Sequence, residues 1–180
     1  MTRSTSDSMF DGRGRPSSCC PDCTSVRYRG EPSCSACGRD RPATGWLSLS
    51  EHPDPFLGRI LEGRFHVTKC EGSGGHSSVY RARTAVGGTV ALKVARIGER
   101  AAAGAERARE RMSREVRAVQ MLTSPHIVSI HEFLELEGGP AAIVMEYVEG
   151  ENAEERVDRE GPFEWRRALE MARQVANGLS

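Results

Sequence analysis

The chain has 180 residues, and 25 Lys and Arg side chains balance 25 Asp and Glu side chains, so its formal net charge is zero. This balance gives no support to nucleic acid or an anionic membrane as a partner. No apolar run approaches the roughly 18 residues of a membrane span. The first residues also lack the apolar core of a secretion signal, so we expect a cytoplasmic protein.

Composition divides the sequence into five regions. Residues 1–17 are rich in Ser, Arg, Asp and Gly without periodicity, which predicts a disordered tail. Pro53 and Pro55 lie in a stretch with few periodic apolar residues, which is typical of a linker. The predicted regions are a tail at 1–17, a cysteine-containing ribbon at 18–45, a linker at 46–62, a folded unit at 63–150 and helices at 151–180.

Two C-x-x-C pairs, ten residues apart, dominate the region 18–45. They supply Cys20 and Cys23, then Cys34 and Cys37. Four thiolates from two tight turns form the tetrahedral set that Zn²⁺ takes in a structural site. A redox dithiol or a disulfide pair is the alternative, and Cys19 is a possible substitute for Cys20. Without a metal this stretch has too few apolar residues to fold.

A glycine-rich turn follows the linker. Its glycines are Gly72, Gly74 and Gly75; glycine permits positive φ and close approach to a ligand, and successive backbone N–H groups in such a turn can hold a phosphate. An ordinary hairpin loop would have the same glycine-rich sequence.

Three strands are expected around this turn, near Phe65–Cys70, at 77–84 and at 89–95. In the last of these strands Lys93 alternates with apolar residues and has alanine on either side of it on the same face.

The next predicted element is a helix at 99–123. Met112, Val116, Val119 and Leu122 form one apolar stripe, and Glu115 falls on that stripe. A carboxylate on a core-facing stripe is costly unless it is paired, so we expect an ion pair with Lys93. Two antiparallel strands at 128–136 and 140–148, joined by a turn at 137–139, come next. A short polar helix at 151–159 and an amphipathic helix at 163–179 complete the pattern.

In this order, the segments resemble the amino-terminal lobe of a bacterial-type serine/threonine protein kinase. The stretch 124–128 resembles the family's HPNIV segment, 143–150 its fifth strand and hinge, and 167–179 the first long helix of its second lobe. Short zinc ribbons ahead of such kinase domains are familiar. The resemblance implies an α+β fold: a five-stranded antiparallel sheet with one helix, the first helices of the large lobe, and a small zinc-ribbon module.

The resemblance also implies a site for ATP with Mg²⁺. Lys93 and Glu115 would form the ion pair that positions the ATP phosphates, and Ser77 replaces the third glycine of the family's turn. Adenine would lie between apolar side chains and meet the hinge backbone. The implied nucleotide contacts are Gly72, Ser73, Gly74, Gly75, Val79, Ala91, Lys93, Met145, Glu146 and Val148.

Residues 1–180 contain no His-Arg-Asp and no Asp-Phe-Gly, the motifs that supply the catalytic aspartate and the Mg²⁺ ligands. We therefore expect the amino-terminal piece of a kinase, which would phosphorylate protein Ser/Thr hydroxyls when complete and is inactive in this form. A non-catalytic, pseudokinase-like interaction protein is the alternative. A zinc-ribbon nucleic-acid binder is a third possibility, which the zero net charge disfavours.

Overall fold

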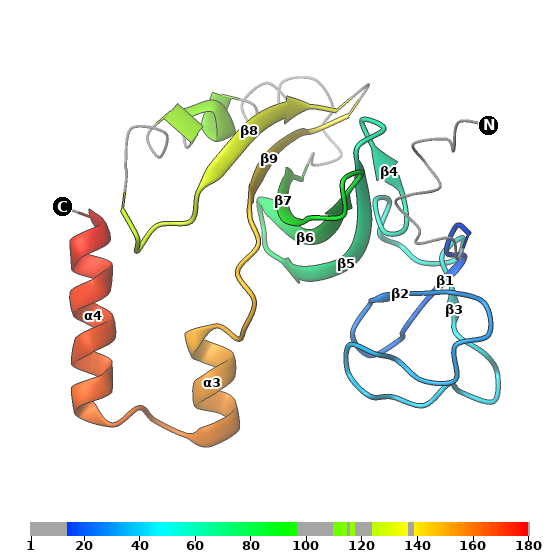
Figure 1. The fold of residues 1–180 in the computed structure, drawn as a ribbon, viewed down its shortest axis with the longest axis horizontal. Helices are drawn as coiled ribbons and strands as arrows, with labels where there is room; N and C mark the ends of the chain where they lie inside the picture. Colours follow the sequence, from blue (N-terminus) through cyan, green and yellow to red (C-terminus); the bar gives the residue numbers. More distant parts are fainter. Residues whose placement is uncertain (1–13, 97–109, 115, 118–123, 137–138, 180) are drawn as a thin grey trace.

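A computed structural model of the protein describes residues 14–96, 110–114, 116–117, 124–136 and 139–179. These residues form a small sheet, a large curved sheet and two helices that follow the large sheet (Figure 1). Several predictions fall outside the described residues and concern the tail at 1–13, Glu115, Val119, Leu122 and the turn residues 137–138.

The small sheet belongs to the cysteine-containing ribbon. It consists of β1 (Ser18–Cys19), β2 (Val26–Arg27) and β3 (Leu47–Ser48), in the order β2-β1-β3 with antiparallel pairings. Strands of two residues cannot hold a sheet together through their own hydrogen bonds. Two of these strand residues, Cys19 and Val26, are buried in the same hydrophobic cluster as the large sheet. The ribbon therefore packs directly against the large sheet.

The large sheet has six strands in the order β4-β5-β6-β7-β9-β8, all antiparallel. The five expected strands are present, and the second and third begin and end where the sequence predicts. The sixth is a two-residue edge strand. The strands are β4 (Ile60–Leu61), β5 (Phe65–Ser73), β6 (Ser77–Thr84), β7 (Thr89–Ala95), β8 (Ile130–Glu135) and β9 (Ala141–Glu146).

Alternation along the strands gives the large sheet two different faces. One face carries the main core cluster, in which Tyr80, Leu92 and Val144 are cross-strand partners. Ile143 lies on the opposite face and packs with Met112 and Val116. These two residues belong to a helical stretch at 110–114 and 116–117, so the described part of the expected helix covers this second face.

Residues 46–62 contribute to both sheets. Leu47–Ser48 pair with β1, and Ile60–Leu61 pair with β5. Between them, the Tyr80 hydroxyl donates a hydrogen bond of 2.9 Å to Asp54, and the ring of Phe56 meets the Tyr80 ring edge-on. The segment expected as a linker is thus packed on the main core face of the large sheet.

The two helices after the sheet are α3 (Ala153–Glu160) and α4 (Trp165–Leu179). Helix α3 begins with a capping box in which Asn152 and Glu155 exchange backbone and side-chain hydrogen bonds. Helix α4 exposes four large apolar side chains, Trp165, Leu169, Val175 and Leu179. Within the described residues, no helix combines the length and apolar character needed to cross a membrane.

We predict that the buried side chain of His66 makes the fold sensitive to acid. His66 is fully buried, and burial, aided by the charge of Arg83, lowers its pKa from 6.5 to about 4. Between these two values the unfolded chain binds a proton that the folded chain does not, so stability falls as the pH drops from about 6.5 to about 4, by about 3 kcal/mol in all. Urea unfolding at pH 7.5 and pH 5 measures the first part of this loss, about 2 kcal/mol.

The matched variants are His66→Phe and, at an exposed position, His76→Phe. His66→Phe should flatten the pH dependence across this window, whereas His76→Phe should keep that of the parent chain. An unchanged slope in His66→Phe would show that the acid sensitivity has another source.

Candidate functional site

Two rows of side chains cross the sheet on the face opposite the main core. Val79, Lys93 and Ile143 are partners across β6, β7 and β9. Arg81, Ala91 and Met145 form the next row. Because directly paired residues of antiparallel strands point to the same face, four predicted nucleotide contacts lie together there. They are Val79, Ala91, Lys93 and Met145.

The glycine-rich turn closes the hairpin between β5 and β6. Gly74 N–H donates to the Ser77 carbonyl at 2.9 Å, and the hydroxyls of Ser73 and Ser78 are 2.9 Å apart. Arg96 donates from its side chain to the Gly74 carbonyl at 3.0 Å. None of the three glycines has positive φ, so that reason for glycine here was wrong. The space around the turn is open, since a Cβ at Gly72 or Gly75 would meet no atom within 4 Å.

A half-buried carboxylate joins the base of this turn to the segment after β9. Glu71 accepts hydrogen bonds from Lys69 Nζ at 2.5 Å, Arg81 Nε at 2.7 Å and the Tyr147 hydroxyl at 3.0 Å. The Arg81 guanidinium also stacks 4.8 Å from the centre of the Tyr147 ring. Burial alone would raise the pKa of Glu71, but the bonds to Lys69 and Arg81 outweigh it and lower the pKa. The glycine-rich turn and the predicted hinge are therefore tied together.

Glu71 and Tyr147 are not among the site residues that the sequence predicts. One signal was available: Lys69, Glu71 and, on the paired strand, Arg81 put opposite charges within reach of one another at the end of β5. The contact with Tyr147 joins residues 76 positions apart, which no local pattern indicates. The expected Lys93–Glu115 pair stays a prediction, because Glu115 lies outside the described residues.

The predicted hinge follows β9 in an extended segment. Glu146 ends the strand, and its backbone N–H donates to the Ser129 carbonyl at 2.9 Å, while its carboxylate accepts from Ser129 N–H at 3.2 Å. Val148 is 62 % exposed. Binding of the adenine edge by the backbone of Glu146 and Val148 stays a prediction.

A cavity of 510 Å³ lies on the other face of the sheet. Residues 52–56 form one wall, and Tyr80, Val94 and Arg96 contribute to the other. Tyr80 and Val94 belong to the main core face, so among the predicted nucleotide contacts this cavity borders Ser73 alone.

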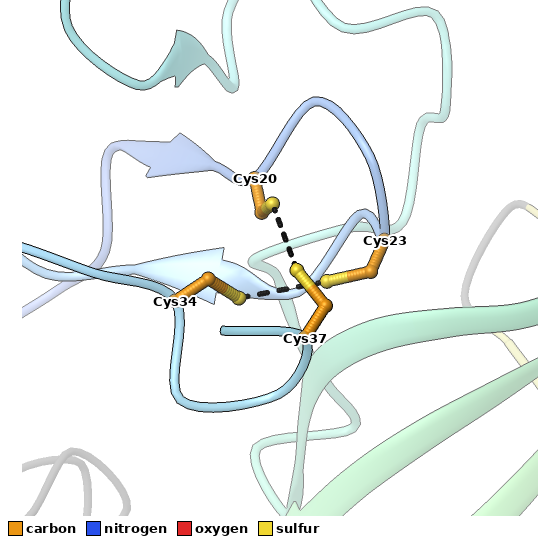
Figure 2. A group of neighbouring side chains, drawn as sticks. All are labelled: Cys20, Cys23, Cys34 and Cys37. Carbon is orange, nitrogen blue, oxygen red and sulfur yellow. Dashed lines mark hydrogen bonds between the residues drawn. The ribbon is translucent and has the colours of Figure 1, made fainter. Parts of the chain in front are cut away.

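The four predicted metal ligands come together in the ribbon. Figure 2 shows their sulfur atoms converging from two loops. All four Sγ atoms lie within 4.8 Å of one another, and the Cys20–Cys37 and Cys23–Cys34 pairs are 3.7 Å and 3.6 Å apart. Ligands about 2.3 Å from a central zinc would be about 3.8 Å apart. The cysteines are free thiols, so this cluster can hold a metal ion.

Cys19 is not part of this cluster. Burial, reinforced by the neighbouring Cys20 and Cys23, raises the pKa of Cys19 to about 11. Burial acts in the same direction on Cys23, but hydrogen bonds with Ser25 outweigh it and lower the pKa of Cys23 to about 7. Burial also raises the pKa of Cys20, so the choice between Cys19 and Cys20 rests on position: the sulfur of Cys20 lies with the other three and that of Cys19 does not.

Residues 65–180 match the family described as protein kinase domain. Serine/threonine-protein kinase pkn2 of Myxococcus xanthus is 39% identical over 122 residues, which are 67% of this chain and 14% of that protein. Serine/threonine-protein kinase PrkC of Bacillus subtilis is 31% identical over 126 residues, which are 69% of this chain and 19% of that protein.

Solved structures agree with these relatives. The kinase domain of Mycobacterium tuberculosis PknI is similar with a TM-score of 0.52 and 27% sequence identity, covering 67% of this chain and 48% of that one. The chain thus spans less than a quarter of the curated relatives named above and about half of this solved domain. The matched part contains the two side-chain rows and the glycine-rich turn.

Proposed function

The chain belongs to the protein kinase family, and on this premise we propose that it forms the ATP-binding part of a serine/threonine protein kinase. The observation that carries the proposal is the pair of rows across β6, β7 and β9. They bring Lys93, Val79, Ala91 and Met145 to one face of the sheet. The parent reaction would transfer the γ-phosphate of ATP, bound with Mg²⁺, to hydroxyl groups of protein substrates.

In this proposal each residue contributes through its place on the sheet. Val79, Ala91 and Met145 would hold the adenine between apolar surfaces, and the backbone of Glu146 and Val148 would bind its edge. The turn residues Gly72, Ser73, Gly74 and Gly75 would follow the phosphates with their backbone N–H groups. Lys93 would place its charge on the phosphates, with Glu115 as its partner.

Residues 1–180 carry no aspartate in a His-Arg-Asp or Asp-Phe-Gly motif. We therefore propose nucleotide binding, without phosphoryl transfer, for the 180-residue chain alone. The curated relatives described above are protein kinases by name, so the alternative of a non-catalytic interaction protein is not favoured.

We propose Zn²⁺ as the ion held by Cys20, Cys23, Cys34 and Cys37. Four thiolates without an open ligand position are the donor set of a structural zinc site, and such a site supplies folding energy to a module that lacks a core of its own. Free, clustered thiols also favour a reducing compartment, for which we propose the cytoplasm.

The test is the affinity of the chain for Mg·ATP, measured by isothermal titration calorimetry. The parent chain should bind, and Lys93→Met should weaken binding about 10- to 100-fold, because a hydrogen bond between charged groups contributes about 1.5–3 kcal/mol. Arg59→Met, which removes an exposed cation before β4, is the matched control and should bind like the parent. Equal affinity in Lys93→Met and the parent would contradict the proposed role of Lys93.

A further inference from the structure

The two cysteine-containing loops of the ribbon have the same pattern of backbone hydrogen bonds. In the first loop, Thr24 N–H donates to the Cys20 carbonyl at 3.0 Å, and Cys20 N–H donates to the Ser25 carbonyl at 2.9 Å. In the second loop, Gly38 N–H donates to the Cys34 carbonyl at 2.7 Å, and Cys34 N–H donates to the Arg39 carbonyl at 2.7 Å. Thr24 and Gly38 therefore occupy equivalent positions, each directly after a cysteine of the cluster.

Only one of the two positions has the residue that its backbone favours. Gly38 has φ 78°, and Thr24 has φ 58°. Positive φ is easy for glycine but is strained for a β-branched side chain. Such strain persists where the surroundings impose it, and it often marks a functional position. We therefore expect the hydroxyl of Thr24 to make an interaction that glycine could not make.

That hydroxyl binds the strand that leads into the glycine-rich turn. Thr24 Oγ1 donates to the Cys70 carbonyl at 3.1 Å and accepts from Cys70 N–H at 3.2 Å. Residues 58–61 pair with the same outer edge of β5 as far as Val67. Beyond Val67, Thr24 takes over at Cys70 on the same edge. Its single hydroxyl satisfies both the N–H and the C=O of Cys70.

Cys70 lies directly before an irregularity in β5. The register between β5 and β6 shifts between Cys70 and Gly72, which leaves Glu71 as the extra residue of a bulge. Glu71 carries the carboxylate that binds Tyr147 of the predicted hinge, and Gly72 begins the turn. A side chain that holds the backbone of Cys70 therefore also holds the start of the Glu71–Tyr147 contact and the start of the glycine-rich turn.

We propose that Thr24 is a positioning residue of the nucleotide site: its hydroxyl holds the backbone of Cys70, and through Glu71 and Gly72 it sets the glycine-rich turn over the hinge. The proposal rests on the proposed function of this face as an ATP site. It makes the ribbon a support for nucleotide binding as well as a separate metal module.

The key variant is Thr24→Gly in the full 180-residue chain. Glycine adopts φ 58° without strain, and this relief offsets the loss of the two hydroxyl hydrogen bonds to Cys70, so the ribbon should keep its zinc and melt close to the parent temperature. Loss of the hydroxyl should nevertheless weaken Mg·ATP binding about three- to tenfold and speed amide hydrogen exchange in the segment 70–75. Thr24→Ser keeps the hydroxyl and should restore both properties, and Thr44→Gly, at an exposed ribbon threonine, is the matched control.

Binding then changes while stability stays close to that of the parent, which a purely structural role would not produce. Thr24→Gly with the parent's affinity and the parent's exchange at 70–75 would overturn the proposal. If the parent chain binds no Mg·ATP, the proposed function fails by itself. The exchange measurement then decides whether Thr24 positions the segment 70–75. Faster exchange at 70–75 in Thr24→Gly alone would then support the positioning role, and unchanged exchange would end it.

Discussion

Replacing Cys34 with serine is expected to release the metal and unfold the ribbon. Cys34 is buried, and its sulfur lies 3.6 Å from that of Cys23. A serine hydroxyl cannot replace a thiolate as a zinc ligand at neutral pH, and zinc binding in small modules contributes about 10–16 kcal/mol to folding. The ribbon's strands of two residues cannot compensate for such a loss. Zinc content per chain and limited proteolysis measure the two effects.

The unfolding should also reach the large sheet. Cys19 and Val26 belong to its hydrophobic cluster, so a released ribbon exposes part of that cluster and lowers the melting temperature of what remains. Cys70→Ser is the matched control, because Cys70 is a cysteine outside the metal cluster. It should retain one zinc per chain. A Cys34→Ser variant that kept its full zinc content and its resistance to protease would rule out the four-cysteine site.

Much of this architecture could be predicted from short-range patterns. The paired C-x-x-C motifs identify the four clustered thiols, because four cysteines in two tight turns have few other arrangements. Alternation fixes the strands at 77–84 and 89–95, since each is long enough to show a period of two. It also places Lys93 and Ala91 on the same face, where the structure has them.

The rest depends on contacts that leave no local pattern. The strands Leu47–Ser48 and Ile60–Leu61 are too short to show a period, and Asp54 is held by a hydroxyl 26 residues away. The bulge at Glu71 has no sequence signal, so the link from Thr24 through Cys70 to Tyr147 could not be foreseen. In this protein the sequence predicts which residues share a face, and the long-range contacts decide what holds that face in place.

Replacing Leu92 with alanine is expected to remove a large part of the stability of the sheet. Leu92 is 1% exposed and lies between Tyr80 and Val144, its partners on β6 and β9. Cutting a buried leucine to alanine costs about 2–5 kcal/mol, because the neighbours only partly fill the cavity. A domain of this size is stable by about 5–15 kcal/mol, so the melting temperature should fall by about 4–20 °C. Urea unfolding and thermal melting give both quantities.

The matched control is Val86→Ala, in the turn between β6 and β7, where the valine is 94% exposed. Trimming a solvent-exposed side chain should change the stability by no more than about 0.5 kcal/mol. A Leu92→Ala variant as stable as Val86→Ala would mean that β7 is not the centre of the core. Because β7 also carries Ala91 and Lys93, it would then follow that the two rows of the proposed nucleotide site lack the rigid support assumed here.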